Sequence, residues 1–160
     1  MIYVIAKLDG ASRARLSWIQ SFAASFGIVP KPIYGHITLA QWEGDEDSFI
    51  ASCKTELADQ CAFSVSYETI EYRKEADALV AAARNEGEIA AVSGKLKQWQ
   101  DDGWTPDTVL LQDKMTNLSW VRSAMGQMFA PFTATVDRIE FVRGVSGGFE
   151  VLDALALKGE

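Results

Sequence analysis

Apolar positions in the first half of the chain alternate between the two-residue period of strands and the longer period of helices. The stretch Ile2–Leu8 predicts a strand, and Gly27 and Pro30 mark the end of a helix that follows it. The apolar face of that helix is expected to hold four residues at helical spacing: Leu16, Ile19, Phe22 and Phe26. A second strand, which carries His36, is predicted next.

The acidic segment Gly44–Asp47 predicts the start of a second helix, because carboxylates in a first turn interact favourably with the helix dipole. The buried face of this helix is expected to hold Phe49, Ile50, Cys53 and Leu57. The stretch Phe63–Tyr72 has period two and predicts a third strand.

The same order of elements then restarts. Ala78–Ala83 predicts a strand, and Asn85 with Glu88 has the spacing of a capping box at the start of a helix. That helix is expected to bury Ile89, Val92, Leu96 and Trp99. Asp107–Leu111 predicts the strand that follows.

Thr116 is the expected N-cap of a last helix. The apolar stripe of this helix is predicted to hold Leu118, Val121, Met125 and Met128. Phe132–Arg143 predicts a long strand, Ser146–Gly148 a turn, and Phe149–Leu157 the final strand.

The segments 62–72 and 131–141 share residues as well as element order, at a constant offset of 69. Chance resemblance of two half-buried strands is the alternative, since period-two alternation limits the residues that fit. We favour a duplication because residue identities and element order agree. The matched pairs are Phe63 with Phe132, Ser64 with Thr133, Ser66 with Thr135, Ile70 with Ile139, Glu71 with Glu140 and Tyr72 with Phe141.

The duplication predicts an α+β protein whose halves are related by a pseudo-twofold axis. We expect a single domain over 1–160, made of two lobe-forming repeats of about 1–75 and 76–160, and we leave open an exchange of terminal strands between the lobes. Two small, mainly antiparallel sheets are expected to line a central cleft, with the helices outside. The strand after the first helix of each half then faces that cleft.

Composition restricts the classes of partner. A net charge of −7 argues against a broad nucleic-acid surface, because such surfaces need cations to neutralise phosphates. No apolar run is long enough to cross a membrane, and no positive region precedes Ile2–Leu8, so we predict a cytoplasmic protein. Two cysteines without CxxC spacing and one histidine make no zinc set, so we predict no metal and no cofactor.

His36 and Thr38 are two residues apart on a predicted strand and therefore point to the same face. A lone histidine on a strand is usually a hydrogen-bonded structural residue. Two such pairs across a groove, however, suit phosphodiester chemistry, with imidazoles as general base and general acid and hydroxyls that donate to phosphoryl oxygens.

The segment GHITLA, a later strand entered through WTP, and the duplicated element order resemble the 2H phosphoesterase superfamily, which includes the 2'-5' RNA ligase and cyclic phosphodiesterase families. The resemblance covers nearly the whole chain. It implies a bilobal α+β fold with one HxT or HxS motif in each lobe, lining a cleft that binds 2',3'-cyclic phosphates or related RNA ends. His36 and Thr38 match the first motif.

The second motif departs from the family pattern. Asp107, Thr108 and Val109 stand where the resemblance implies a histidine, a variable residue and a threonine. Asp107 could accept a proton as a base, but an ionised carboxylate cannot donate one and repels phosphate. Val109 has no donor. An active enzyme therefore needs a replacement acid.

Other residues are weaker candidates. Tyr34 shares a face with His36 and Thr38 at the cleft edge, and Trp42 could stack on a base at the cleft mouth. Five polar residues near strand ends could meet a phosphate, although a solvated surface role is the usual one for such residues. They are Lys7, Arg73, Gln112, Lys114 and Arg143.

Three functional hypotheses follow. The first is an RNA ligase-like or cyclic phosphodiesterase enzyme with weakened or altered activity. The second is a noncatalytic relative that binds a nucleotide, a phosphorylated metabolite or an RNA end. The third is a protein interaction module that keeps the duplicated scaffold, since a fold does not determine function.

Overall fold

The computed structural model describes residues 1–28, 34–112, 118–146 and 148–159. The strands are β1 Ile2–Leu8, β2 His36–Trp42, β3 Phe63–Arg73, β4 Ala78–Ala83, β5 Asp107–Gln112, β6 Phe132–Val145 and β7 Gly148–Ala156. The helices are α1 Gly10–Ser21, α2 Glu46–Glu56, α3 Glu88–Lys95 and α4 Leu118–Gly126, with 3-10 turns η1 Phe22–Phe26, η2 Lys74–Ala76 and η3 Lys97–Trp99. The predictions for Pro30, Lys114, Thr116 and the middle of the turn Ser146–Gly148 fall on residues outside the described ranges.

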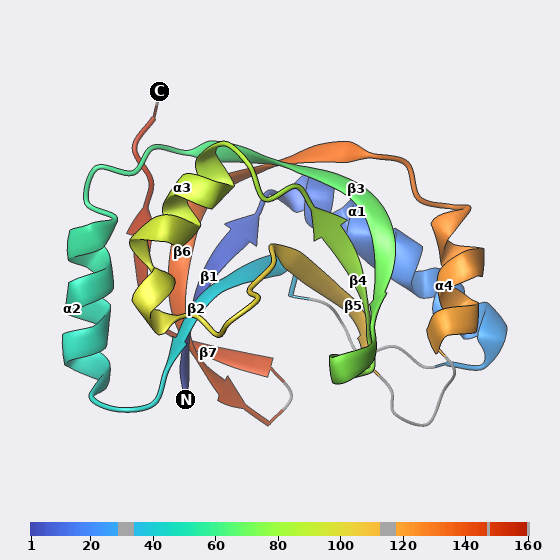
Figure 1. Cartoon of the computed structure of the whole chain (residues 1–160), viewed down its shortest axis with the longest axis horizontal. Coiled ribbons are helices and arrows are strands. Elements are labelled where there is room, and N and C mark those ends of the chain that lie inside the picture. The colour runs from blue at the N-terminus through green and yellow to red at the C-terminus, as the bar shows by residue number, and fades with distance from the viewer. Residues whose placement is uncertain (29–33, 113–117, 147, 160) are drawn as a thin grey trace.

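All seven strands belong to one antiparallel sheet, which confirms the predicted α+β class (Figure 1). The order is β2-β1-β6-β3-β4-β5, and β7 also pairs with β6. The N-terminal part of β6 pairs with β3, and the rest pairs with β1 and β7. The two predicted sheets are therefore the two ends of one sheet, because β6 spans 14 residues and serves both.

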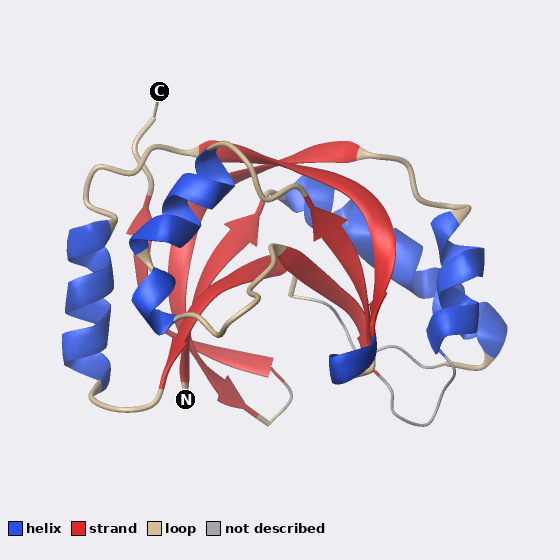
Figure 2. Ribbon diagram, in the orientation of Figure 1, coloured by secondary structure: helices blue, strands red, loops and turns tan. Residues whose placement is uncertain are grey.

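Side chains along β1 and β2 point alternately to the two faces of this sheet. Val4, Ala6, Ile37 and Leu39 are buried on one face, which packs against the helices. His36 and Thr38 lie on the other face and are half-buried. We call this second face, which also carries Asp107 and Val109, the motif face. The helices lie at the two ends of the arched sheet, α2 and α3 at one end and α1 and α4 at the other (Figure 2).

Helix ends show where local signals succeed and fail. Gly27 ends the first helical segment in the left-handed conformation, as predicted, although the segment changes to a 3-10 turn at Phe22. The predicted capping box is wrong: the N-cap of α3 is Gly87, without a side-chain cap bond. Because α3 begins at Glu88, this residue lies in the first turn and not three positions beyond a cap. Met128 lies beyond α4 and is exposed.

The described residues can be compared with the expectations for membrane spans, cysteines and metal sites. No helix in the described part of the chain is long and apolar enough to span a membrane. Cys53 is a buried free thiol and Cys61 an exposed one. Within the described ranges, no group of three or more histidine, cysteine, aspartate or glutamate side chains is arranged to hold a metal ion.

Candidate functional site

The turn before β2 requires a glycine. Gly35 has a φ of 71°, and a Cβ added there would lie 2.3 Å from Cγ of Arg13. The carbonyl of Gly35 accepts a hydrogen bond from the amide of Leu8, which ties the turn to the end of β1. This local backbone geometry places His36 as the first residue of β2.

Pairing registers equate the two motif strands. In the first half, His36 pairs with Lys7 and Thr38 with Ile5, and the register shifts between Val4 and Ile5. In the second half, the register between β4 and β5 shifts between Leu79 and Val80. Val80 pairs with Val109 and Ala82 pairs with Asp107, as Ile5 pairs with Thr38 and Lys7 with His36. Asp107 therefore occupies the position of His36, which supports the proposed repeat.

The two motif strands meet although they do not pair. The sheet curves so that its edge strands β2 and β5 lie side by side (Figure 1). Three side chains of the second half donate hydrogen bonds to β2 carbonyls: Thr108 to His36 at 2.9 Å, Trp104 to Thr38 at 2.8 Å and Gln100 to Leu39 at 2.7 Å. Gln20 donates in the opposite direction, to the carbonyl of Leu110 at 2.8 Å. We call this contact the β2–β5 seam.

Two aromatic rings surround the imidazole of His36. The ring centroids of Tyr34 and Phe149 lie 5.5 and 5.3 Å from that of His36, and 5.3 Å from each other. Nδ1 of His36 is buried, with no hydrogen-bond partner in the described part of the chain. Burial lowers the pKa of His36 to about 4, against the smaller opposing effect of the negative charge on Glu140. The imidazole is therefore neutral at pH 7, and burial makes it a weaker base than an exposed histidine.

Glu140 is the buried anion beside this cluster. Its carboxylate lies 3.1 Å from Nζ of Lys7 and 3.5 Å from Nε of Arg138, and it accepts a hydrogen bond of 3.0 Å from the Tyr34 hydroxyl. Burial and this hydrogen bond raise the pKa of Tyr34, so the phenol stays protonated. Lys7 also lies over the Tyr34 ring, 5.3 Å from its centroid.

The equivalent position in the second half is occupied by an ion pair. Nε and Nη2 of Arg73 donate to the two carboxylate oxygens of Asp107 at 2.9 and 3.1 Å, and the Thr105 hydroxyl donates at 2.8 Å. The hydrogen bond and charge of Asp107 raise the pKa of Arg73 despite its partial burial. Val109 is 48% exposed and has no polar atom in its side chain. The second half therefore presents a neutralised carboxylate and an apolar surface.

Solved structures share this arrangement of strands and helices over the whole chain. TT0787 of Thermus thermophilus matches with a TM-score of 0.70 and 18% identity, covering 99% of this chain and 98% of that one. LigT of E. coli in its apo form matches with a TM-score of 0.70 and 14% identity, covering 98% and 96%. This chain has the LigT fold. A phosphoesterase matches with a TM-score of 0.66 and 13% identity, covering 98% of both chains.

The LigT fold confirms, for the architecture, the resemblance to the 2H phosphoesterases found in the sequence. LigT structures complexed with NADP+, with 3'-AMP and with ATP also match this chain. No family model and no curated protein sequence matches it.

The structure separates the weaker candidates. Tyr34 and Lys7 join the cluster around His36, and Arg73 joins Asp107. Trp42 lies on the helix-covered face, where its ring stacks on that of Phe49 with the ring centroids 6.1 Å apart. It therefore does not share the face of His36. The two other polar candidates within the described ranges have different partners: Gln112 bonds to the Ala76 carbonyl, and Arg143 bonds to Glu46 and Glu150.

Three residues of the site were not candidates from the sequence. Glu140 had a visible signal, because it belongs to the repeated strand and matches Glu71 at the offset of 69. Phe149 and Thr108 had none, because their roles depend on contacts with His36 from distant parts of the chain.

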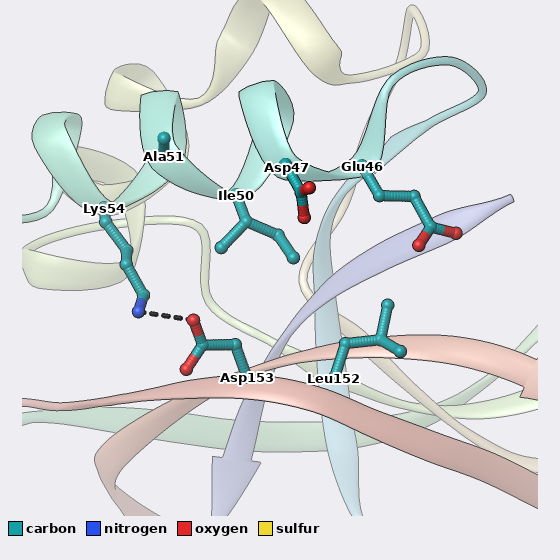
Figure 3. Close-up of a pocket in the computed structure, with 7 residues that line it drawn as sticks. All are labelled: Glu46, Asp47, Ile50, Ala51, Lys54, Leu152 and Asp153. Carbon is teal, nitrogen blue, oxygen red and sulfur yellow. Dashed lines mark hydrogen bonds and ion pairs between the residues drawn. The ribbon is translucent and has the colours of Figure 1, made fainter.

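A cavity lies away from the cluster around His36. It has a volume of about 420 Å³ and lies between α2 and β7 (Figure 3). Lys54 crosses it to form an ion pair with Asp153 at 2.5 Å. Its lining residues are Glu46, Asp47, Ile50, Ala51, Lys54, Leu152 and Asp153, none of which belongs to the cluster around His36.

Replacing Phe149 with alanine is expected to raise the pKa of His36 from about 4 toward 6.5, because water then reaches the imidazole. The low pKa of His36 destabilises the wild type as pH falls from about 6.5 through 4, since only the unfolded state binds the proton readily. Phe149→Ala should flatten that loss. Because the chain has one histidine, NMR titration of labelled histidine gives one curve.

Val145→Ala is the matched control for this titration. Val145 lies on the same β6–β7 hairpin and is 47% exposed, outside the three-ring cluster. An unchanged pKa of His36 in Phe149→Ala, or an equal rise in Val145→Ala, would show that Phe149 does not control the hydration of the imidazole.

Proposed function

We propose that this chain binds a small phosphorylated ligand of the nucleotide class on the motif face at the β2–β5 seam, and that its cyclic phosphodiesterase activity is weakened. The observation that carries the proposal is the unequal pair of half-sites. His36 and Thr38 are intact and half-buried, whereas Asp107 is held by Arg73 and Val109 has no donor. The LigT-fold structures with 3'-AMP, NADP+ and ATP support the ligand class.

Ligand binding requires fewer groups than turnover. The Thr38 hydroxyl and the cation of Lys7, which pairs with His36 across the sheet, are available to phosphoryl oxygens on this face. Lys7 and Arg138 carry two positive charges against the single charge of Glu140, so the first half is locally cationic although the whole chain carries −7. This local excess suits a phosphate and does not suit a long polyanion.

Turnover of a 2',3'-cyclic phosphate requires two proton transfers. Neutral His36 can take a proton from the attacking water while the water oxygen bonds to phosphorus. The bond from phosphorus to the departing ribose oxygen then breaks, and that oxygen needs a proton. Asp107 stands where the second imidazole would supply it, and its two oxygens already accept hydrogen bonds. We therefore propose that His36 is the base of a residual reaction that lacks an efficient acid and whose base is weakened by burial.

The binding experiment titrates 3'-AMP into the wild-type protein by calorimetry and follows the His36 ring by NMR. We expect saturable binding with a shift of the His36 signals, and an affinity about tenfold lower in Thr38→Val because one charge-assisted hydrogen bond is lost. Slow hydrolysis of 2',3'-cyclic AMP that disappears in His36→Ala supports residual catalysis. Binding without such hydrolysis supports the noncatalytic alternative, and no binding contradicts the proposal.

A further inference from the structure

The hydroxyl of Thr108 links the second motif to the backbone of the first. Thr108 is 2% exposed and points to the helix-covered face, opposite to Asp107 and Val109. Its Oγ1 donates to the His36 carbonyl at 2.9 Å. This contact joins residues 72 positions apart in the chain, on two strands that do not pair with each other.

A second hydroxyl bonds to Thr108, and the carbonyl acceptor fixes the direction of both bonds. The Tyr67 hydroxyl lies 2.6 Å from Oγ1 of Thr108, and Tyr67 is fully buried in β3. A threonine hydroxyl has one proton, which Thr108 gives to the His36 carbonyl. Tyr67 is therefore the donor to Thr108, and the chain of bonds runs from Tyr67 through Thr108 to His36. Burial keeps water from replacing either bond.

We propose that Thr108 is a positioning residue for His36, and that Tyr67 holds its hydroxyl in place. The β2 position equivalent to Thr108 is Ile37, which has no such group, so the brace runs in one direction only. The second motif thus holds the first in place from within the helix-covered core. For its effect on ligand affinity, this inference rests on the proposed nucleotide site.

Trp104 and Gln100 act on neighbouring carbonyls of the same strand but do not make this contact redundant. They bond to the carbonyls of Thr38 and Leu39, farther along β2 from its first residue. Thr108 alone among the described seam donors reaches the carbonyl of His36, the first residue of β2, which directly follows Gly35 with its positive φ. Loss of the hydroxyl therefore removes the seam bond at the end of the strand that carries the imidazole, while the pairing of His36 with Lys7 remains.

The test compares Thr108→Val, Thr108→Ser and Tyr67→Phe in protein labelled at its single histidine. We expect Thr108→Val to shift the carbonyl carbon and ring signals of His36 in the ligand-free protein, and to weaken 3'-AMP binding about fivefold to tenfold. Thr108→Ser keeps the donor and should restore both. Tyr67→Phe should give a smaller shift, because the Thr108 hydroxyl then lacks its own donor.

Ile89→Val is the control for a general loss of stability. Ile89 is buried on α3, outside the seam, and loses one methylene in this variant. Unchanged His36 signals in Thr108→Val, equal shifts in Ile89→Val, or failure of Thr108→Ser to restore them would each overturn the positioning role. The ligand-free signals decide this point even if 3'-AMP does not bind the wild type, an outcome that would contradict the proposed function alone.

Discussion

A variant that carries both Asp107→His and Val109→Thr is expected to hydrolyse 2',3'-cyclic AMP roughly a hundredfold to ten-thousandfold faster than the wild type. The new imidazole supplies a proton donor at the position that the strand registers equate with His36, and the new hydroxyl supplies a donor to phosphoryl oxygen. Arg73, released from its carboxylate partner, adds a free cation beside the phosphate. The rate is measured at neutral pH by chromatography of the 2'- or 3'-phosphate product.

Two controls isolate the imidazole in this experiment. Asp107→Asn with Val109→Thr also releases Arg73 from its charged partner and adds the hydroxyl, but it provides no group that transfers a proton. It should stay near the wild-type rate. Adding His36→Ala to the two-histidine variant should remove the gain. If the two-histidine variant folds and binds 3'-AMP but is no faster than the asparagine control, the geometry inferred for the second half-site is wrong.

Replacing Glu140 with alanine is expected to lower the free energy of unfolding by about 1–3 kcal/mol, because a buried hydrogen-bond acceptor is lost and two partly exposed cations lose their partner. The Glu140 side chain is 2% exposed, and its loss also leaves the Tyr34 hydroxyl without its acceptor. The change is measured by urea denaturation at pH 7.

Glu71 provides a matched comparison because it holds the equivalent place in the first copy of the repeated strand. Its side chain is 33% exposed and pairs with Arg122 at 3.2 Å. Glu71→Ala should therefore cost only about 0–1 kcal/mol, as is usual for a solvated ion pair. Equal costs at the two positions would contradict the view that Glu140 is a buried structural anion of the site.

The positions of the strands along the chain followed from local patterns of apolar and polar residues. Ile2–Leu8 and Ala78–Ala83 have the predicted bounds, and the alternation along β2 correctly placed His36 and Thr38 on one face. Period-two patterning is strong in these strands because one face meets the helices and the other does not. Helix ends were less predictable. Asn85 and Glu88 have the spacing of a capping box, yet α3 begins at Glu88 with Gly87 at its N-cap, in a positive-φ conformation that favours glycine.

Some features of the candidate site could be predicted from the sequence, and others depend on the folded structure. The HxT pattern, the similarity of segments 62–72 and 131–141 and the missing second histidine are visible in the amino-acid order alone, because each is a property of residue identities and spacings. The pairing of Arg73 with Asp107, the ring of Phe149 beside His36 and the bond from Thr108 join segments 34 or more residues apart. The order of strands in the sheet brings Arg73 to Asp107 and Phe149 to His36, and the curvature of the sheet brings Thr108 to His36, so no spacing along the chain encodes these contacts.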